Sequence, residues 1–306
     1  MTRAAHAPTA WFDDRALTAC LPPHLRAYAA YSRLAVVRRT GRVVGGSLLL
    51  RTIHRLSRPL HLPGDARVEV AGRVVHLDVT DPRFLWVLDE VRGRSHEHRV
   101  MQSVLERGDT FLDVGANHGS FAVLASHVVG PAGRVVAVEP QSKLARLLRR
   151  SLAEAPAPFE VHAVALADHD GEALLHIPCS GSGSASVAAR PREPGRSLPV
   201  PVRAADDLLD WRRFPGSLML KLDVEGSELA FLRGARTMIR ERRPILLFEL
   251  NAVQARAAGH EPQDVIAELA AVGYRRFSEV DRYPEEVSGS ALDLTIQRNL
   301  VALPSP

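Results

Sequence analysis

Cysteine is scarce in this 306-residue chain, which has only Cys20 and Cys179 and no CxxC spacing. Two distant cysteines argue against a disulfide framework and against a thiolate zinc site. Long hydrophobic runs are also missing: no stretch approaches the about 18 apolar residues of a membrane span, and the opening MTRAAHAPTAWFDDRAL has no apolar signal-like core. We therefore expect a cytoplasmic protein without an integral membrane segment.

Lysine is almost missing as well: of 39 basic residues only Lys143 and Lys221 are lysines. The basic charge is concentrated in residues 1–66, which hold ten arginines against three aspartates. Within this segment SLLLRTIHRL (47–56) has apolar residues at helical spacing. We predict a basic, partly helical N-terminal extension, either a cap packed on the main domain, a docking helix, a nucleic-acid arm or a membrane-surface helix.

The rest of the chain divides into two parts. Residues 67–108 read as a hairpin with Gly72 at its turn, followed by a helix from about Pro82 to Leu105. Residues 109–306 alternate strand and helix patterns, which predicts an α/β, doubly wound, mostly parallel sheet. Its seven expected strands are 109–114, 133–140, 159–168, 217–224, 244–250, 274–280 and 293–303. The last two are joined without a helix and predict an antiparallel edge pair.

A stretch rich in glycine, serine and proline, CSGSGSASVAARPREPGRSLP (179–199), interrupts this alternation. It is too polar to be part of the core. Its place in the chain puts it near the carboxyl ends of the strands, where either a mobile lid or a plain disordered loop fits the pattern.

A glycine loop, FLDVGANHG (111–119), joins the first of these strands to a helix. Gly115 and Gly119 would let the backbone turn tightly and approach a ligand at the helix N-terminus. The dinucleotide fingerprint GxGxxG is not met, because Asn117 occupies the second glycine position and no third glycine is in register. The loop suits a ligand without phosphates, such as S-adenosylmethionine. Asp113 would then lie near the amino-acid end of that ligand.

Acidic residues at two further strand ends support this hypothesis. Glu139, followed by Pro140, ends the second strand, where its carboxylate can accept hydrogen bonds from ribose hydroxyls. Asp168 ends the expected third strand and is placed to meet an adenine amino group. Strand-end acids and a glycine loop aimed at one crevice predict a cofactor site. His118 is expected to be a solvated residue at the helix start.

Several segments in order carry a family resemblance: DVGANHGSFAVLA, GRVVAVEPQSKLARLLRRSL, VALADHDGEALLHIP, VRAADDLL, LKLDVEGSELAFLRGA and RPILLFELN. This series resembles the FkbM family of S-adenosylmethionine-dependent O-methyltransferases, which have the class I Rossmann-like fold. The resemblance covers roughly residues 75–300, leaves residues 1–66 uncovered, and implies methyl transfer to a hydroxyl of a sugar, polyketide or similar secondary metabolite.

The stretch LMLKLDVEGSELAFL (218–232) is the expected catalytic segment. Period-2 alternation places Lys221, Asp223 and Glu225 on one side of the fourth strand. An aliphatic hydroxyl needs a base or a metal to react, so we predict that Asp223 is the general base or a metal ligand. Lys221 is expected to pair with a neighbouring acid or to reach the substrate pocket. Glu225 and Glu228 could instead complement the dipole of the next helix.

Glu249 and Asn251 end the neighbouring fifth strand. Together with Asp223 they offer an all-oxygen set for Mg²⁺, which is the alternative to a direct base.

We predict in-line methyl transfer to a small-molecule hydroxyl acceptor, with S-adenosylmethionine as the cofactor. The alternative is an RNA methyltransferase that uses the basic N-terminal segment, although that segment lacks interleaved aromatic residues. A cofactor-binding scaffold and a dinucleotide dehydrogenase fit the acidic set less well. The oligomeric state is not readable from the sequence, and a homo-oligomer stays open.

Overall fold

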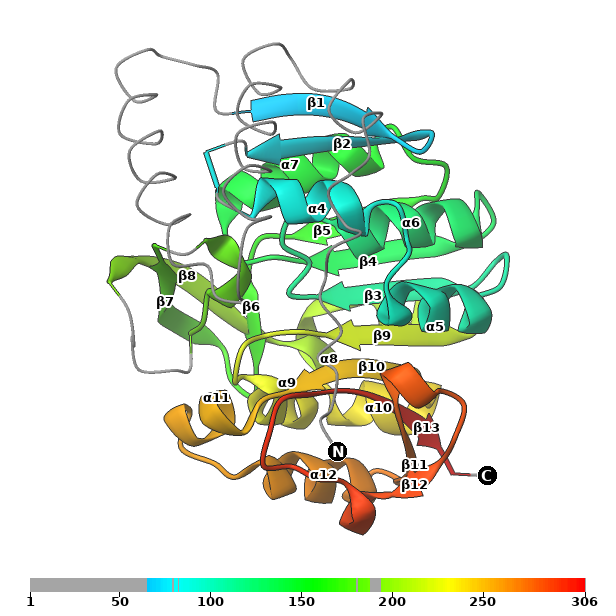
Figure 1. Cartoon of the computed structure of the whole chain (residues 1–306), viewed down its shortest axis with the longest axis vertical. Helices are drawn as coiled ribbons and strands as arrows, with labels where there is room; N and C mark the ends of the chain where they lie inside the picture. Colours follow the sequence, from blue (N-terminus) through cyan, green and yellow to red (C-terminus); the bar gives the residue numbers. More distant parts are fainter. Residues whose placement is uncertain (1–64, 79, 82, 180, 188–193, 306) are drawn as a thin grey trace, which may run out of the picture.

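The computed structural model of the chain describes residues 65–78, 80–81, 83–179, 181–187 and 194–305 (Figure 1). The basic extension, up to residue 64, and its predicted helix at 47–56 lie outside the described residues, so all the alternatives for that segment stay predictions. Within the described residues, no helix combines the length and the apolar character needed to cross a bilayer.

The predicted hairpin is confirmed. Strands β1 (Asp65–Val70) and β2 (Arg73–Asp78) pair antiparallel, and the last partners are Val70 and Arg73. Ala71 and Gly72 form the two-residue turn with φ of 52° and 73°, the left-handed backbone that suits the twist of a tight hairpin.

The prediction of a single helix between residues 82 and 105 is wrong. The segment forms two helices, α4 (Phe84–Glu90) and α5 (His96–Val104). Gly93 lies between them with φ of 71°, and Ser95 then starts α5 by accepting a hydrogen bond from the backbone N–H of His98.

The main sheet has the strand order β12-β11-β13-β10-β9-β3-β4-β5. The five adjacent strands β10, β9, β3, β4 and β5 run parallel, and β13 pairs antiparallel with both β10 and β11. The doubly wound α/β fold and its final antiparallel pair are therefore confirmed, and β12 adds an eighth, two-residue strand. The strands are β3 (Thr110–Val114), β4 (Arg134–Val138), β5 (Phe159–His162), β9 (Leu218–Leu222), β10 (Ile245–Leu250), β11 (Tyr274–Glu279), β12 (Val287–Ser288) and β13 (Arg298–Pro304).

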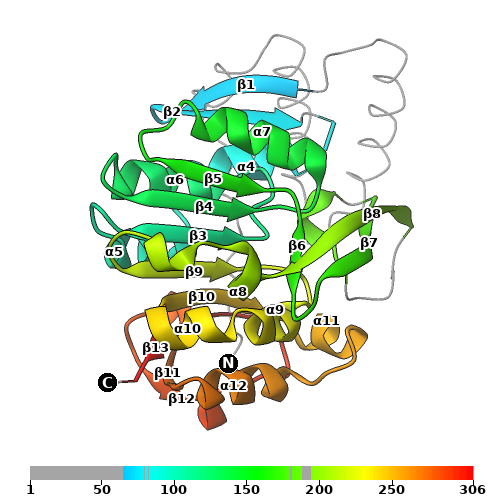
Figure 2. The same ribbon diagram turned by 180° about the vertical axis from the view of Figure 1, so that it is seen from behind.

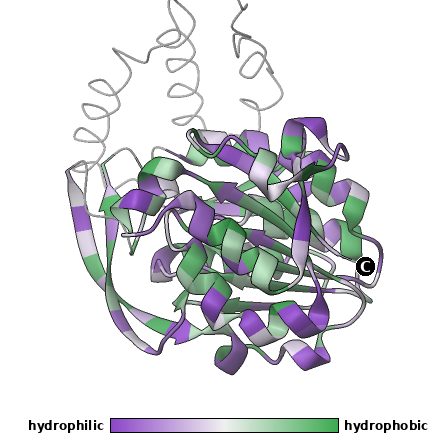
Figure 3. Cartoon of the chain, turned by 90° about the horizontal axis from the view of Figure 1, so that it is seen from below, coloured by the Kyte–Doolittle hydropathy of each residue, from purple (hydrophilic) through white to green (hydrophobic). Residues whose placement is uncertain are grey.

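Alternate residues of these strands build two cores, one on each face of the sheet. Phe111 packs with α4, α5, α6 (Ser120–Val129) and α7 (Ser142–Leu152), whereas its neighbour Leu112 packs with α8, α9, α10 and α12 on the opposite face. Figures 1 and 2 show the two helical layers from opposite sides, and Figure 3 shows the hydrophobic residues gathered in the strands between them. The remaining helices are α8 (Ala205–Leu208), α9 (Glu228–Gly234), α10 (Arg236–Arg242), α11 (Ala252–Ala257) and α12 (Pro262–Ala271), with short 3₁₀ turns η1 (Ser182–Ser184), η2 (Trp211–Arg213), η3 (Val280–Arg282) and η4 (Gly289–Ala291).

The prediction of a single third strand at 159–168 is also wrong. Only β5 joins the main sheet; β6 (Ala165–Ala167) leaves it and pairs with β8 (Gly195–Ala204), which pairs in turn with β7 (Gly171–Pro178). The apolar run is continuous in sequence, so it does not reveal the change of pairing partner. The resulting three-stranded sheet lies at the carboxyl ends of the parallel strands (Figure 1).

Candidate active site

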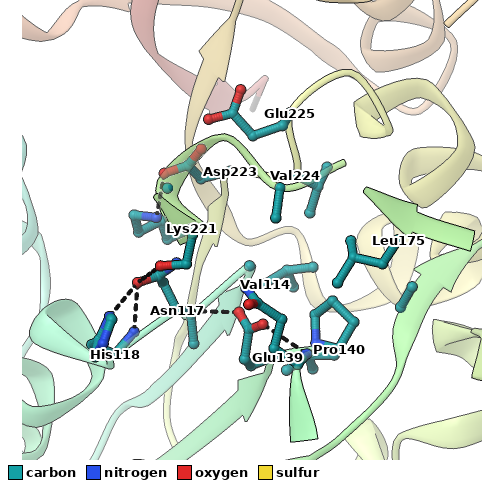
Figure 4. Close-up of a pocket in the computed structure, with 18 of the residues that line it drawn as sticks. Val114, Asn117, His118, Glu139, Pro140, Leu175, Lys221, Asp223, Val224 and Glu225 are labelled. Carbon is teal, nitrogen blue, oxygen red and sulfur yellow. Dashed lines mark hydrogen bonds and ion pairs between the residues drawn. The ribbon is translucent and has the colours of Figure 1, made fainter. Parts of the chain in front are cut away.

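A cleft lies at the carboxyl ends of β3, β4 and β9 and encloses about 800 Å³ of empty space, part of it open to solvent. Its floor comes from the strand ends and the loops that follow them, and α4 and the β7–β8 sheet supply the walls. Glu139 and Pro140 lie at one end and Asp223 and Glu225 at the other, as Figure 4 shows. Its position at the carboxyl ends of parallel strands follows the rule for ligand sites in open α/β sheets.

The glycine loop forms part of this floor and is fixed to the neighbouring strand. The backbone N–H groups of Gly115 and Ala116 both donate to the carbonyl of Val138, each at 3.0 Å. Gly115 has φ of 81°, and a Cβ built on it would lie 1.9 Å from the backbone oxygen of Asp223. Only glycine fits here, which brings the backbone of the loop directly against the loop after β9.

Gly119 has a different role from the one we predicted. It precedes α6 with φ of 83°, but a Cβ on it would lie 2.1 Å from the side chain of Leu148 in α7. Gly119 is not among the cleft residues, and its missing side chain serves helix packing.

Glu139 is a buried, fixed carboxylate at the end of β4, with 3% of its surface exposed. Its two oxygens accept hydrogen bonds from the backbone N–H groups of Asn117 and Gln141, each at 2.8 Å. Burial raises the pKa of Glu139 to about 7, and these two N–H groups oppose the increase. Each oxygen keeps a lone pair for a ligand hydroxyl, and Asn117 and Pro140 line the cleft beside it.

Asp113 lies behind the cleft wall and does not line the cleft. It is 1% exposed, and its nearest cation is the Lys221 ammonium, 3.8 Å from Oδ1. Burial raises the pKa of Asp113 to about 6, while the positive charge of Lys221 lowers it. Asp113 therefore acts on the site through Lys221.

Lys221 and Asp223 form an ion pair inside the cleft, with Nζ 3.1 Å from Oδ2. Burial alone would lower the pKa of Lys221, but the charges of Asp223 and Asp113 outweigh it and raise the pKa. Lys221 is thus a permanent ammonium and cannot serve as a base. It also lies 4.8 Å from the ring centroid of Phe121, and that ring stacks on the buried His98 with 4.0 Å between the ring centroids.

Glu225 occupies the turn after β9 with φ of 53° and lines the cleft. The amide of Gln254 donates to its carboxylate, and its carbonyl accepts a hydrogen bond from the hydroxyl of Ser186 at 2.7 Å. Burial, followed by the charges of Asp223, Glu249 and Glu228, raises the pKa of Glu225 to about 9. At neutral pH this side chain is a carboxylic acid.

Glu228 belongs to the turn and not to the cleft surface. It is 3% exposed, and its carboxylate accepts a hydrogen bond from the backbone N–H of Gly226 at 3.1 Å. Burial raises the pKa of Glu228 to about 7, which the backbone N–H of Gly226 opposes, and its contribution to the dipole of α9 stays a prediction.

The expected magnesium set does not assemble. Asn251 starts α11, where its side chain accepts from the backbone N–H of Val253 at 3.0 Å, and neither it nor Glu249 lines the cleft. Burial and the charge of Asp223 raise the pKa of Glu249. Across the part of the chain that the structure describes, no three His, Cys, Asp or Glu side chains converge as metal ligands.

Two further expectations need correction. Asp168 follows β6 and not a strand of the main sheet, so it lies outside the cleft, where it pairs with the exposed His169 at 2.9 Å. His118 is not solvated but 1% exposed, with its ring Nδ1 2.7 Å from the side-chain oxygen of Asn117. Burial lowers the pKa of His118 to about 4; the negative charge of Asp81 opposes this shift and the positive charge of Arg83 adds to it.

Sequence reasoning missed the residues that reach the cleft from outside the strand ends. Arg83, Val87 and Glu90 project from α4 at helical spacing, a signal that is visible in the sequence only once the helix is known to cover the cleft. Ser182 comes from the Gly/Ser-rich stretch and shares two hydrogen bonds with Asn117, at 2.9 and 3.2 Å. The described part of that stretch therefore closes one side of the cleft.

The sequence matches a known family and a curated relative. The model of the methyltransferase FkbM domain matches residues 113–276. The chain is also 24% identical over 198 residues to the hexuronic acid methyltransferase AglP of Haloferax volcanii, covering 64% of this chain and 76% of that protein.

Two solved structures are similar at low identity. Methyltransferase FkbM from Methylobacillus flagellatus KT is 17% identical with a TM-score of 0.40; the match covers 90% of this chain, which spans only 65% of that one. A SAM-dependent O-methyltransferase from Thermotoga maritima is 11% identical, covers 82% of both chains and has a TM-score of 0.39.

Proposed function

Since the chain belongs to the FkbM methyltransferase family and is a methyltransferase, we propose that it transfers the methyl group of S-adenosylmethionine to a hydroxyl of a small molecule, such as a sugar. The observation that carries the cofactor assignment is the Glu139 carboxylate, which two backbone N–H groups hold at the end of β4. A carboxylate fixed in this way can accept both hydroxyls of a ribose.

The residues of the cleft fit this cofactor. The Glu139 end of the cleft offers the apolar surface of Pro140, Leu166 and Leu175 beside the fixed carboxylate. When bound, the cofactor would supply an electrophilic methyl group, and the reaction would need only alignment of the acceptor and removal of its proton.

Asp223 is the proposed proton acceptor. It lies in the cleft across from the cofactor end, and its partner Lys221 holds its carboxylate at 3.1 Å. The ammonium, in turn placed by Asp113 and Phe121, orients this carboxylate and stabilises negative charge at the acceptor oxygen. Glu225, being protonated at neutral pH, would donate a hydrogen bond to the acceptor and not take its proton.

The deciding experiment is isothermal titration calorimetry with S-adenosylmethionine, followed by a screen for labelled-methyl transfer to sugar and macrolide hydroxyls. We expect cofactor binding and transfer to oxygen. Binding of NAD in place of S-adenosylmethionine, or transfer to nitrogen or carbon only, would overturn the proposal.

A further inference from the structure

The Glu139 carboxylate separates two sides of the cleft that differ in chemistry. Pro140, Leu166 and Leu175 line one side, where an adenine ring would find apolar surface. Figure 4 shows Leu175 and His118 on opposite sides of Glu139. With a ribose bound at Glu139, as the proposed function requires, the amino-acid arm of S-adenosylmethionine would therefore extend towards His118.

The residue that we expected at the amino-acid end, Asp113, does not line the cleft. Lys221 does, but its ammonium lies between Asp223, at 3.1 Å, and Asp113, at 3.8 Å. The amino-acid group of the cofactor carries a carboxylate and an ammonium, and each needs a partner when it leaves water. Two other residues that line the cleft, His118 and Arg83, have a buried nitrogen atom without a hydrogen-bond partner among the described residues.

His118 presents a hydrogen-bond acceptor. Its Nδ1 lies 2.7 Å from the side-chain oxygen of Asn117, and the backbone N–H of His118 donates to that same oxygen at 2.9 Å. Because an amide oxygen only accepts, the proton of the neutral ring is on Nδ1 and the lone pair is on Nε2. Nε2 is buried on a side chain that is 1% exposed, and nothing in the described structure donates to it. A ligand N–H, such as that of an ammonium group, would satisfy this lone pair.

Arg83 presents hydrogen-bond donors. One terminal nitrogen of its guanidinium donates to Glu90 at 2.9 Å, whereas its Nε is buried and has no partner in the part of the chain that the structure describes. The other terminal nitrogen lies close to Gly183, where a Cβ would approach it to 2.6 Å. A guanidinium has five N–H donors, so a carboxylate can bind Arg83 without displacing Glu90.

A continuous set of hydrogen bonds joins these two residues on one side of the cleft. Asp81 accepts from the backbone N–H of Arg83 at 3.0 Å and from that of Ser182 at 3.3 Å. The hydroxyl of Ser182 donates to Asn117 at 3.2 Å, and Asn117 holds the ring of His118. Burial is the main cause of the lowered pKa of His118, and the charge of Arg83 adds to it, as expected for near neighbours. An unpartnered donor and an unpartnered acceptor therefore face the same part of the cleft.

We infer that Arg83 and His118 bind the amino-acid end of S-adenosylmethionine. The guanidinium of Arg83 binds the carboxylate, and the Nε2 lone pair of His118 accepts a hydrogen bond from the ammonium. This inference rests on the proposed function, since it assigns binding residues for the same cofactor. Arg83 lies at the start of α4, before residue 113, where the match to the methyltransferase FkbM domain begins.

The test compares two ligands that differ at this end alone. S-adenosylhomocysteine carries the amino-acid arm, whereas 5′-methylthioadenosine has a methyl group in its place on the same sulfur and the same adenosine. Isothermal titration calorimetry with the full chain measures the affinity of both. We expect the wild-type protein to bind S-adenosylhomocysteine about a hundredfold more tightly, because hydrogen bonds to charged groups are stronger than those between neutral groups.

Arg83→Met keeps the length of the side chain but removes its donors. It should weaken binding of S-adenosylhomocysteine about tenfold to a hundredfold and change binding of 5′-methylthioadenosine less than about twofold. Arg150→Met, an exposed position in α7, is the control and should leave both affinities unchanged.

His118→Asn keeps an amide at the position of Nδ1 but has no atom at the position of Nε2. It should weaken binding of S-adenosylhomocysteine about tenfold and spare 5′-methylthioadenosine. His118→Gln, whose amide oxygen can take the position of Nε2, should recover most of this loss. The exposed His96→Asn at the start of α5 is the control.

The inference is overturned if the wild-type protein binds the two ligands equally, or if either Arg83→Met or His118→Asn leaves the difference between them unchanged. Thermal melting identifies a variant that does not fold. The wild-type protein then decides with analogues of S-adenosylhomocysteine that lack only the carboxylate or only the ammonium: each should bind about tenfold more weakly, and undiminished affinity of either contradicts the inference. If neither adenosine ligand binds the wild-type protein, the proposed function itself is wrong.

Discussion

A Cβ on Gly115 would lie 1.9 Å from the backbone oxygen of Asp223, so the loop after β3 and the loop after β9 meet without room for a single methyl group. The first loop belongs to the proposed cofactor end and the second carries the proposed base. Their contact is backbone against backbone, which fixes the distance between the two ends of the cleft more firmly than side chains could.

Gly115→Ala should therefore damage the site and not only the backbone. The backbone oxygen cannot move cheaply, and φ of 81° adds a cost of about 1 kcal/mol for any L-residue. Gly72→Ala is the matched control, because Gly72 has φ of 73° and open space around it. Denaturant unfolding should show a clearly larger loss of stability for Gly115→Ala, and calorimetry a loss of cofactor affinity. Equal behaviour of the two variants would contradict the contact.

Glu139→Gln should weaken binding of S-adenosylmethionine about tenfold to a hundredfold. The glutamine amide keeps the shape of the side chain but has one oxygen in place of two. One backbone N–H and one ligand hydroxyl therefore lose their acceptor. Calorimetry measures the effect, with Glu172→Gln on the exposed surface of β7 as control. Unchanged affinity would place the ribose elsewhere.

Asp223→Asn should lower turnover about a hundredfold or more while cofactor affinity stays nearly intact. The amide oxygen can still accept from Lys221, so the fold of the loop is retained, but the group can no longer take a proton. Asp207→Asn, an exposed position in α8, is the control. Wild-type turnover in Asp223→Asn would exclude Asp223 as the base.

Glu225 should make the ligand-free protein less stable as the pH rises. Its pKa in the folded protein is about 9, above its ordinary value of 4.5, so between pH 7 and 9 the folded state holds a proton that the unfolded state has lost. The stabilising contribution is complete below pH 4.5 and is lost as the pH rises towards 9. The slope is on the order of 1 kcal/mol per pH unit, and Glu225→Gln should flatten it. A slope that persists in the variant would assign it to another group.

Methyl transfer should continue in excess EDTA. The expected magnesium set is not formed, because Asn251 is occupied as the N-cap of α11 and Glu249 lies outside the cleft. Loss of activity that added Mg²⁺ restores would revive the metal-assisted alternative.

The sequence predicted those features that depend on local pattern. Apolar alternation placed β3, β4, β9 and β10, and the position of Glu139 and Asp223 at their carboxyl ends led directly to the cleft. The prediction that Asp168 lies in the cofactor site was wrong, because the apolar run before it divides into β5, in the main sheet, and β6, which pairs with β8. The residues of β8 that determine this pairing are distant in the sequence. Arg83 and Glu90 could not be found, since nothing local indicates that α4 covers the cleft.

Strand β13 lies between β10 and β11, although it is the last strand of the described chain. During synthesis, β11 therefore emerges before β13, the strand that connects it to the rest of the sheet. Until then, the two-residue β12 is the one described strand with which it can pair in the native order. The edge of the sheet can form only after almost the whole described chain has left the ribosome, and its pairing spans contacts with β10 about 50 residues earlier. A late, non-local closing step of this kind leaves strand edges exposed in the nascent chain, so aggregation during synthesis should depend on β13 more than on any strand of the parallel core.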